Sequence, residues 1–166
     1  MEKPVFEETQ RSVVIIIVSI MVTVIVGLLA VMKIIGDKPS YGMVIAFIVT
    51  VITCFLLGSQ KLKITITPDE IVYSFGIFSS GSVIKIGDVQ RMSIIKYDAL
   101  TDFWGWGVRY NSTTDCYTVE GNVGLEITLL NSNMKILIGT QKQAELQSIL
   151  QTHFADKLQL PDENKS

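Results

Sequence analysis

Long apolar runs without a charge occupy the first third of the chain. The first covers residues 13–32, VVIIIVSIMVTVIVGLLAVM, and the second covers 43–58, MVIAFIVTVITCFLLG. A helix in the core of a soluble domain normally shows a polar stripe, and neither run has one. Because a helix rises about 1.5 Å per residue, the first run would cover about 30 Å, the thickness of a bilayer's hydrocarbon core. The pattern therefore predicts two membrane-spanning helices.

These helices are expected at about 12–35 and 41–58, as a hairpin over 12–58 that is joined by the polar loop 36–42. A cleaved signal peptide is the main alternative for the first run. Its apolar region is usually about 7–15 residues long and ends in a small-x-small cleavage site. Here the run is longer, and the segment 1–11 before it carries three glutamates. We therefore expect the segment to stay attached to the hairpin.

Small residues recur at intervals of four in both runs, which places them on one face of each helix. Helices in lipid associate by close packing, so small residues mark the contact between them. The residues predicted to pack the hairpin are Ser19, Thr23, Gly27, Ala46, Thr50 and Cys54. On this interpretation the cysteine is a packing residue rather than a redox thiol.

Basic residues near the helix ends predict the orientation, because cytoplasmic flanks carry an excess of them. The side with both chain ends carries four, and the connecting loop carries two. They are Lys3, Arg11, Lys61 and Lys63 on the first side and Lys33 and Lys38 in the loop. Both termini are therefore expected in the cytoplasm, with 1–11 as a cytoplasmic segment.

After residue 61 the period of the apolar positions changes to two. KLKITIT, residues 61–67, alternates strictly, as a half-buried strand does. Turn-forming residues then separate further short strands. These are expected at 71–78, 83–86, 92–97, 105–110, 116–119, 123–130 and 134–138, with a hairpin loop at 131–133. Short strands at this spacing indicate an all-β sandwich or barrel.

A single amphipathic helix, at about 141–156, is expected to end this domain. Its apolar face is formed by Leu146, Ile149, Leu150 and Phe154. Thr140 and Gln143 fit a capping box, in which each side chain accepts from the other residue's backbone N–H. The β domain then covers 61–156, and 157–166 form a polar tail that is expected to be disordered from Pro161 onward.

The order of elements and several local phrases resemble the bacterial pleckstrin-homology-like (PH-like) domains that follow membrane hairpins. The phrases are ITPDEIVYSFGIF, GDVQRM, DFWGWGVRY and VGLEITLLNSNMKILIGT, within residues 61–154. The resemblance implies a partly open antiparallel sandwich that is plugged at one end by the helix, and a role in binding or assembly. The basic phosphoinositide-binding loop of eukaryotic relatives is not evident, because the first turn is the acidic Pro68-Asp69-Glu70.

The sequence contains few residues in patterns typical of catalytic or metal-binding sites. His153 is the only histidine, and the chain has no CxxC, HExxH or GxSxG pattern, so we expect no catalytic residues, metal or cofactor. Asp98, Asp102 and Asp115 flank the tryptophan segment without the spacing of an EF-hand loop, and solvated carboxylates are the favoured interpretation. Residues 61–166 hold 10 basic and 12 acidic side chains, which argues against nucleic acid as a partner.

Both tryptophans lie in TDFWGWGVRY, residues 101–110. If 103–110 is a strand, Trp104, Trp106 and Tyr110 share one face, and Arg109 lies on the other face together with the glycines. The bulky face is predicted to pack in the domain core, at the membrane interface that tryptophan and tyrosine favour, or against a ligand or partner. These four residues are the candidate interface.

The sequence therefore predicts a non-enzymatic protein of a bacterial cytoplasmic membrane. Its cytoplasmic PH-like domain would bind the lipid surface, another membrane protein or a second copy of the chain. One alternative is an accessory subunit of a membrane transport complex, although neither run contains the charge that usually marks a transport pathway. The other is a membrane-bound enzyme with a site around Arg109.

Overall fold

The computed structural model describes residues 3–36, 41–76 and 81–159, so the loop 36–42 and the tail 157–166 lie partly outside the described residues. The chain divides into two compact units. One is the helical unit Arg11–Gln60, and the other is a β unit made of Met1–Gln10 and Lys61–Ser166.

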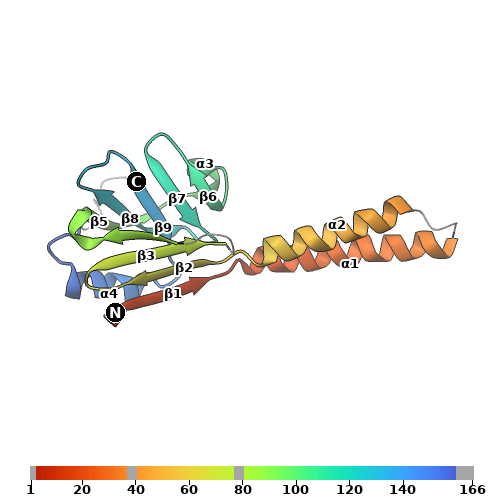
Figure 1. Ribbon diagram of the computed structural model, residues 1–166, viewed down its shortest axis with the longest axis horizontal. Helices are drawn as coiled ribbons and strands as arrows, with labels where there is room; N and C mark the ends of the chain where they lie inside the picture. Colours follow the sequence, from red (N-terminus) through yellow and green to blue (C-terminus); the bar gives the residue numbers. More distant parts are fainter. Residues whose placement is uncertain (1–2, 37–40, 77–80, 160–166) are drawn as a thin grey trace. The chain divides into compact units, whose positions relative to one another are not determined.

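The helical unit is the expected pair of apolar helices, α1 (Val13–Gly36) and α2 (Tyr41–Gly58), which run side by side (Figure 1). Both are long and apolar enough to cross a membrane. Large apolar side chains are exposed along both helices, and no described residue of α2 is buried. Backbone hydrogen bonds within each helix satisfy the peptide groups, so lipid can surround such a pair.

The first sheet of the β unit is an antiparallel meander in the order β1-β2-β3-β4. Its strands are β1 (Phe6–Gln10), β2 (Leu62–Ile66), β3 (Glu70–Phe75) and β4 (Ser82–Lys85). The strand β1 was not predicted, because the inward positions of FEETQ include Glu8 and Gln10, and polar residues there hide the alternation. The helical unit is thus inserted between two paired strands.

The second sheet has five strands in the order β5-β8-β9-β7-β6. They are β5 (Val89–Lys96), β6 (Gly107–Tyr110), β7 (Thr114–Thr118), β8 (Val123–Leu129) and β9 (Lys135–Gly139). The expected hairpin between the last two strands is present, and the other pairs are antiparallel except for β7 with β9, which is parallel. This parallel pair departs from the wholly antiparallel sandwich that the resemblance implied.

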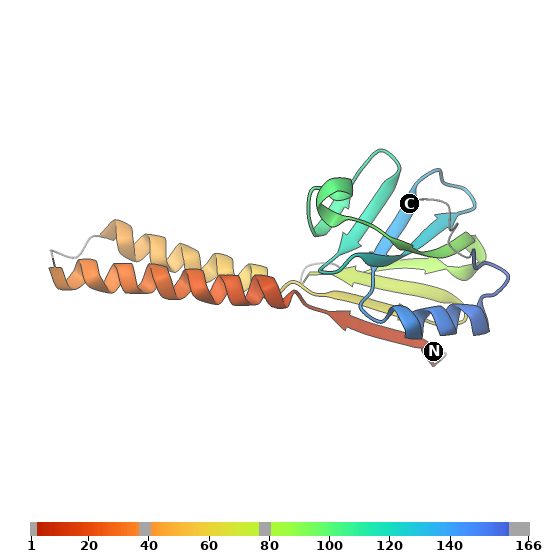
Figure 2. The ribbon, with the colours of Figure 1, turned by 180° about the vertical axis from the view of Figure 1, so that it is seen from behind.

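The inner faces of the two sheets and the C-terminal helix α4 (Gln143–His153) share one apolar core. Two views show α4 lying along the side of the β unit that carries β1 (Figures 1 and 2). Leu146, Leu150 and Phe154 are buried in the core, and Ile149 packs against it, so the predicted apolar face of the helix is confirmed.

The predicted capping box at the start of α4 is wrong. The Thr140 hydroxyl donates to the Glu8 carboxylate at 2.7 Å, and the Gln141 N–H donates to the same carboxylate at 2.8 Å. Lys142 occupies the N-cap position. Glu8 lies on β1, more than 130 residues earlier, so no local pattern could reveal it.

The C-terminal segment also joins the second sheet. The Met92 N–H donates to the Lys157 carbonyl, and the Gln159 N–H donates to the Met92 carbonyl, both at 2.8 Å. The start of the predicted polar tail is therefore held against β5, and the part predicted to be disordered lies outside the described residues.

Candidate binding groove

The tryptophan segment is not the strand that alternation predicted. Residues Ala99–Phe103 form a short helix, α3, whose first N–H groups donate to the side chain of Asp98. Trp104 ends this helix in the left-handed conformation, with φ 60°. Gly105 and Gly107 follow with φ of 119° and 116°, a region that glycine adopts easily. The strand β6 begins only at the second of these glycines.

The expected shared face of the tryptophans is therefore wrong. The Trp104 side chain is 90% exposed, and Trp106 is 41% exposed and donates from Nε1 to the Gly121 carbonyl at 3.2 Å. The glycines beside them serve the backbone turn, and a Cβ at Gly107 would lie 3.5 Å from the Arg109 guanidinium.

Within β6 the predicted alternation holds. Val108 and Tyr110 line a groove between the two sheets, whereas Arg109 pairs across the ladder with Cys116 and belongs to the opposite face. The Arg109 guanidinium donates to the Val108 carbonyl at 3.1 Å, so it stays close to its own strand.

This groove has a volume of about 430 Å³, within the range of about 300–1,000 Å³ typical of ligand pockets. It lies between the β3–β4 end of the first sheet and the β6–β7 hairpin of the second. Its lining residues are Tyr73, Ser74, Phe75, Ser82, Val108, Tyr110 and Tyr117. Among the described residues, no charged side chain lines it.

Three tyrosines dominate the groove. The rings of Tyr73 and Tyr117 meet edge to face, with centroids 4.9 Å apart and planes inclined by 62°. Burial raises the pKa of the Tyr117 hydroxyl, and the neighbouring Tyr73 and Tyr110 raise it further. The phenol of Tyr117 is therefore neutral near pH 7, and it offers hydrogen bonds rather than charge.

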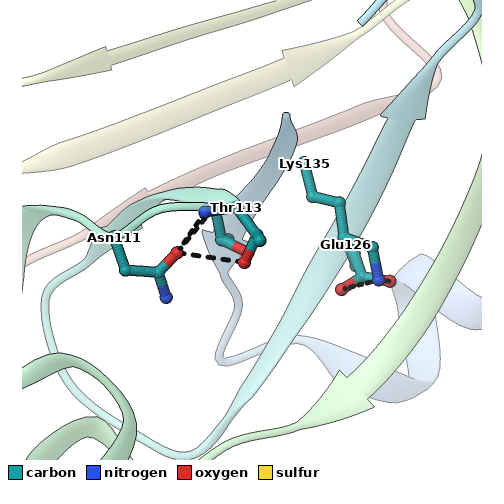
Figure 3. A network of polar contacts seen from close by, with 5 residues as sticks. Asn111, Thr113, Glu126 and Lys135 are labelled. Carbon is teal, nitrogen blue, oxygen red and sulfur yellow. Dashed lines mark hydrogen bonds and ion pairs between the residues drawn. The ribbon is translucent and has the colours of Figure 1, made fainter. Parts of the chain in front are cut away.

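A tight turn joins the strands that carry Tyr110 and Tyr117, and Figure 3 shows its residues Asn111 and Thr113. The Asn111 side-chain oxygen accepts from the backbone N–H groups of Thr113 at 2.9 Å and Thr114 at 2.6 Å, and from the Thr113 hydroxyl at 3.2 Å. Such an Asx turn fixes the β6–β7 connection. Figure 3 also shows the Lys135–Glu126 ion pair, at 3.1 Å, which links β9 to β8.

The opposite face of the second sheet holds a small buried cluster beneath α3, formed by Tyr97, Ala99, Cys116 and Leu137. Burial raises the pKa of the Cys116 thiol to about 11 and that of Tyr97 to about 12. A reactive cysteine needs a lowered pKa, so this thiol is a packing residue.

The aspartates near α3 act as local hydrogen-bond acceptors. The Asp98 side chain accepts from the Leu100 N–H at 3.0 Å, and the Asp102 carboxylate accepts from the Asp98 N–H at 2.8 Å. Within 3–36, 41–76 and 81–159, no three His, Cys, Asp or Glu side chains gather in a way that could hold a metal ion.

The structure brings part of the predicted hairpin-packing set together. The Cys54 thiol donates to the Ser19 carbonyl at 3.4 Å, and a Cβ at Gly27 would meet the Phe47 ring at 3.2 Å. Ala46 is exposed, because the contact face of α2 passes through Phe47 instead. The hydroxyls of Thr23 and Thr50 donate within their own helices, to the carbonyls of Ser19 and Ala46.

Sequence reasoning included Tyr110 in the candidate interface and missed Tyr73, Phe75 and Tyr117. All three occur in segments predicted as strands, but the sequence analysis assigned none of them to a face. The sequence pattern did not reveal the packing of the two sheets, which brings Tyr73 of β3 against Tyr117 of β7.

Comparison of the chain with protein-family models, with curated proteins and with solved structures gives no match in any of the three. The likeness to PH-like domains stays a prediction. The geometry of the groove and the surfaces of the helices are therefore the features that bear on function.

Proposed function

We propose that this protein is a membrane-anchored, non-enzymatic binding module. The helix pair crosses the membrane, and the β unit presents the groove of Tyr73, Phe75, Tyr110 and Tyr117 to a ligand. The observation that carries the proposal is the exposure of large apolar side chains along α1 and α2. Exposed apolar area of this extent is unfavourable in water and favourable in lipid.

The pairing of β1 with β2 supports two crossings rather than one. Gln10 pairs with Leu62, so the connections to α1 and from α2 start at neighbouring positions of one sheet. Both connections are only a few residues long. The start of α1 and the end of α2 must then lie on the same side of the membrane. The excess of basic residues on that side favours the cytoplasm.

The chemistry of the groove supports binding rather than catalysis. Its described lining offers aromatic rings and hydroxyl groups, and the burial of Tyr117 disfavours the phenolate that a general base would need. Arg109, the centre of the enzyme alternative, belongs to the other face of the sheet. The transport alternative gains no support from Thr23 and Thr50, which hydrogen-bond within their own helices.

Membrane extraction tests the anchor. The full chain should stay in the membrane fraction after washes with high salt and alkaline carbonate, and detergent should release it. A variant with Ile20→Lys and Val24→Lys, at exposed positions of α1, should be integrated poorly, because a lysine at a helix centre costs about 3 kcal/mol. The matched Ile20→Leu, Val24→Leu variant should behave as the native chain. Release of the native chain by carbonate alone would contradict the anchor.

A further inference from the structure

We propose that the groove between the sheets binds a quaternary ammonium group. The inference rests on the proposed function, because it names the ligand class of the same groove. Four of the seven lining residues are aromatic, namely Tyr73, Phe75, Tyr110 and Tyr117, and the other three are Ser74, Ser82 and Val108.

The arrangement of the rings suits a cation. The face of an aromatic ring carries partial negative charge, and a cation within about 6 Å of its centroid is attracted. Tyr73 is only 6% exposed and meets Tyr117 edge to face, so it supports the Tyr117 ring from the core. The rings that an entering group can meet are the half-buried Phe75 and Tyr117 and the exposed Tyr110. Tyr110 stands at the opening, with 69% of its side chain exposed, where it can contact an entering group.

The charges near the groove do not favour an anion. No basic side chain lines the described groove, and the nearest one along β6, Arg109, lies on the opposite face. The sequence pI of about 5.4 also makes the whole chain acidic at neutral pH. No described acidic side chain lines the groove either, so a cation there would be held by ring faces rather than by a carboxylate.

A quaternary ammonium fits better than a primary one. A primary ammonium carries N–H groups that need hydrogen-bond acceptors once water is removed, and burying them unpaired is costly. Methyl groups on nitrogen need no such partner and pack against aromatic rings. The volume of about 430 Å³ leaves room for the group to which the nitrogen is attached. That group can be a free small molecule or the choline headgroup of a lipid.

A titration of the full chain in maltoside detergent tests the proposal. The tyrosine rings are labelled with ¹³C, and their chemical shifts are followed against choline and against 3,3-dimethyl-1-butanol, its neutral analogue of the same shape. Choline should shift tyrosine resonances of the groove and bind about tenfold more tightly than the neutral analogue, because only choline carries the positive charge that ring faces attract. Equal affinity for choline and for the neutral analogue would overturn the proposed selectivity for a cation, although the groove would remain a binding site.

Two variants test whether choline binds in the groove. Tyr110→Leu removes an exposed ring of the groove and should weaken choline binding severalfold, whereas Trp104→Leu removes an exposed ring outside it and should not. Unchanged binding in Tyr110→Leu, or no shift with choline at all, would overturn the proposal without affecting membrane extraction.

Nanodiscs of phosphatidylcholine should displace choline if the headgroup is the ligand, and nanodiscs of phosphatidylglycerol should not. If neither displaces it, the site takes the free cation. Tighter binding of inorganic phosphate than of choline would also contradict the inference.

Discussion

Asn111 organises the β6–β7 turn through three hydrogen bonds to one oxygen atom. Tyr110 precedes it, and Tyr117 lies on the returning strand. A single amide side chain therefore stabilises the turn between the two strands that carry these groove residues. The neighbouring Ser112 is exposed and is a natural control.

We expect Asn111→Ala to lower the free energy of unfolding by about 1–2 kcal/mol, because two backbone N–H groups lose their acceptor. Hydrogen exchange at Thr113 and Thr114 should become faster. Urea unfolding and amide exchange of the full chain in detergent measure both effects. Ser112→Ala should change neither, and equal behaviour of the two variants would show that the turn does not depend on the amide.

Cys116 gives the β unit a predictable response to alkaline pH. Its folded pKa is raised from 9.0 to about 11 by burial, so the folded state keeps a proton that the unfolded state loses. Stability from this group is fully present below pH 9, decreases as pH rises above 9, and is lost above about pH 11. Urea unfolding of the full chain should show this decrease, and Cys116→Ala should show a smaller one. Identical slopes for both chains would contradict a buried thiol.

At the scale of elements, β1 is the strand that the sequence pattern did not predict. Strict alternation revealed β2, and the period of the apolar residues revealed α4, because each buries an apolar face. In β1 the inward Glu8 is only 5% exposed, and its carboxylate is satisfied by Thr140 and Gln141. A buried carboxylate with partners so far along the chain gives no periodic signal.

Glu8→Ala should therefore destabilise the β unit by about 1–3 kcal/mol, since a buried hydroxyl and a partly buried N–H lose their acceptor. Glu7→Ala is the matched control on the adjacent residue. Glu7 forms an exposed ion pair with Lys63, at 2.9 Å, and such pairs contribute about 0–1 kcal/mol. Urea unfolding compares them. A larger effect at Glu7 than at Glu8 would mean that β1 is not docked as described.

The helix pair allows a similar comparison between a packed position, Gly27, and an exposed one, Ile45. Gly27→Leu would force a side chain against Phe47, where a Cβ alone would already lie at 3.2 Å. We expect a lower melting temperature for the hairpin in detergent, whereas Ile45→Leu, at an exposed position of α2, should leave it unchanged. Circular dichroism during heating measures both. Equal melting of the two variants would remove the case for close packing at Gly27.

The candidate site was predictable only in part. Alternation in 108–110 correctly separated Tyr110 from Arg109. The same alternation failed for Trp104 and Trp106, because Asp98 caps a helix there and the glycines adopt positive φ. Local side-chain hydrogen bonds outweighed the periodic pattern in this segment.

At the scale of the whole molecule, the hairpin is inserted into a sheet rather than attached to its end. Both outer helix ends continue into β1 and β2, which pair from Phe6 with Ile66 to Gln10 with Leu62. This insertion explains why the N-terminal segment belongs to the β unit. If the helices cross the membrane as proposed, this strand pairing requires residues 10 and 62 to lie on the same side of it, independent of any count of basic residues.

Labelling of single cysteines on intact cells tests this account most directly. In a background with Cys54→Ala and Cys116→Ala, one cysteine is placed by Lys3→Cys, Ser40→Cys or Ser166→Cys. We expect an impermeant maleimide to label Ser40→Cys on intact cells, and to label Lys3→Cys and Ser166→Cys only after lysis. The reverse pattern would contradict the cytoplasmic orientation. Labelling of Lys3→Cys and Ser166→Cys from opposite sides would contradict the inserted hairpin itself.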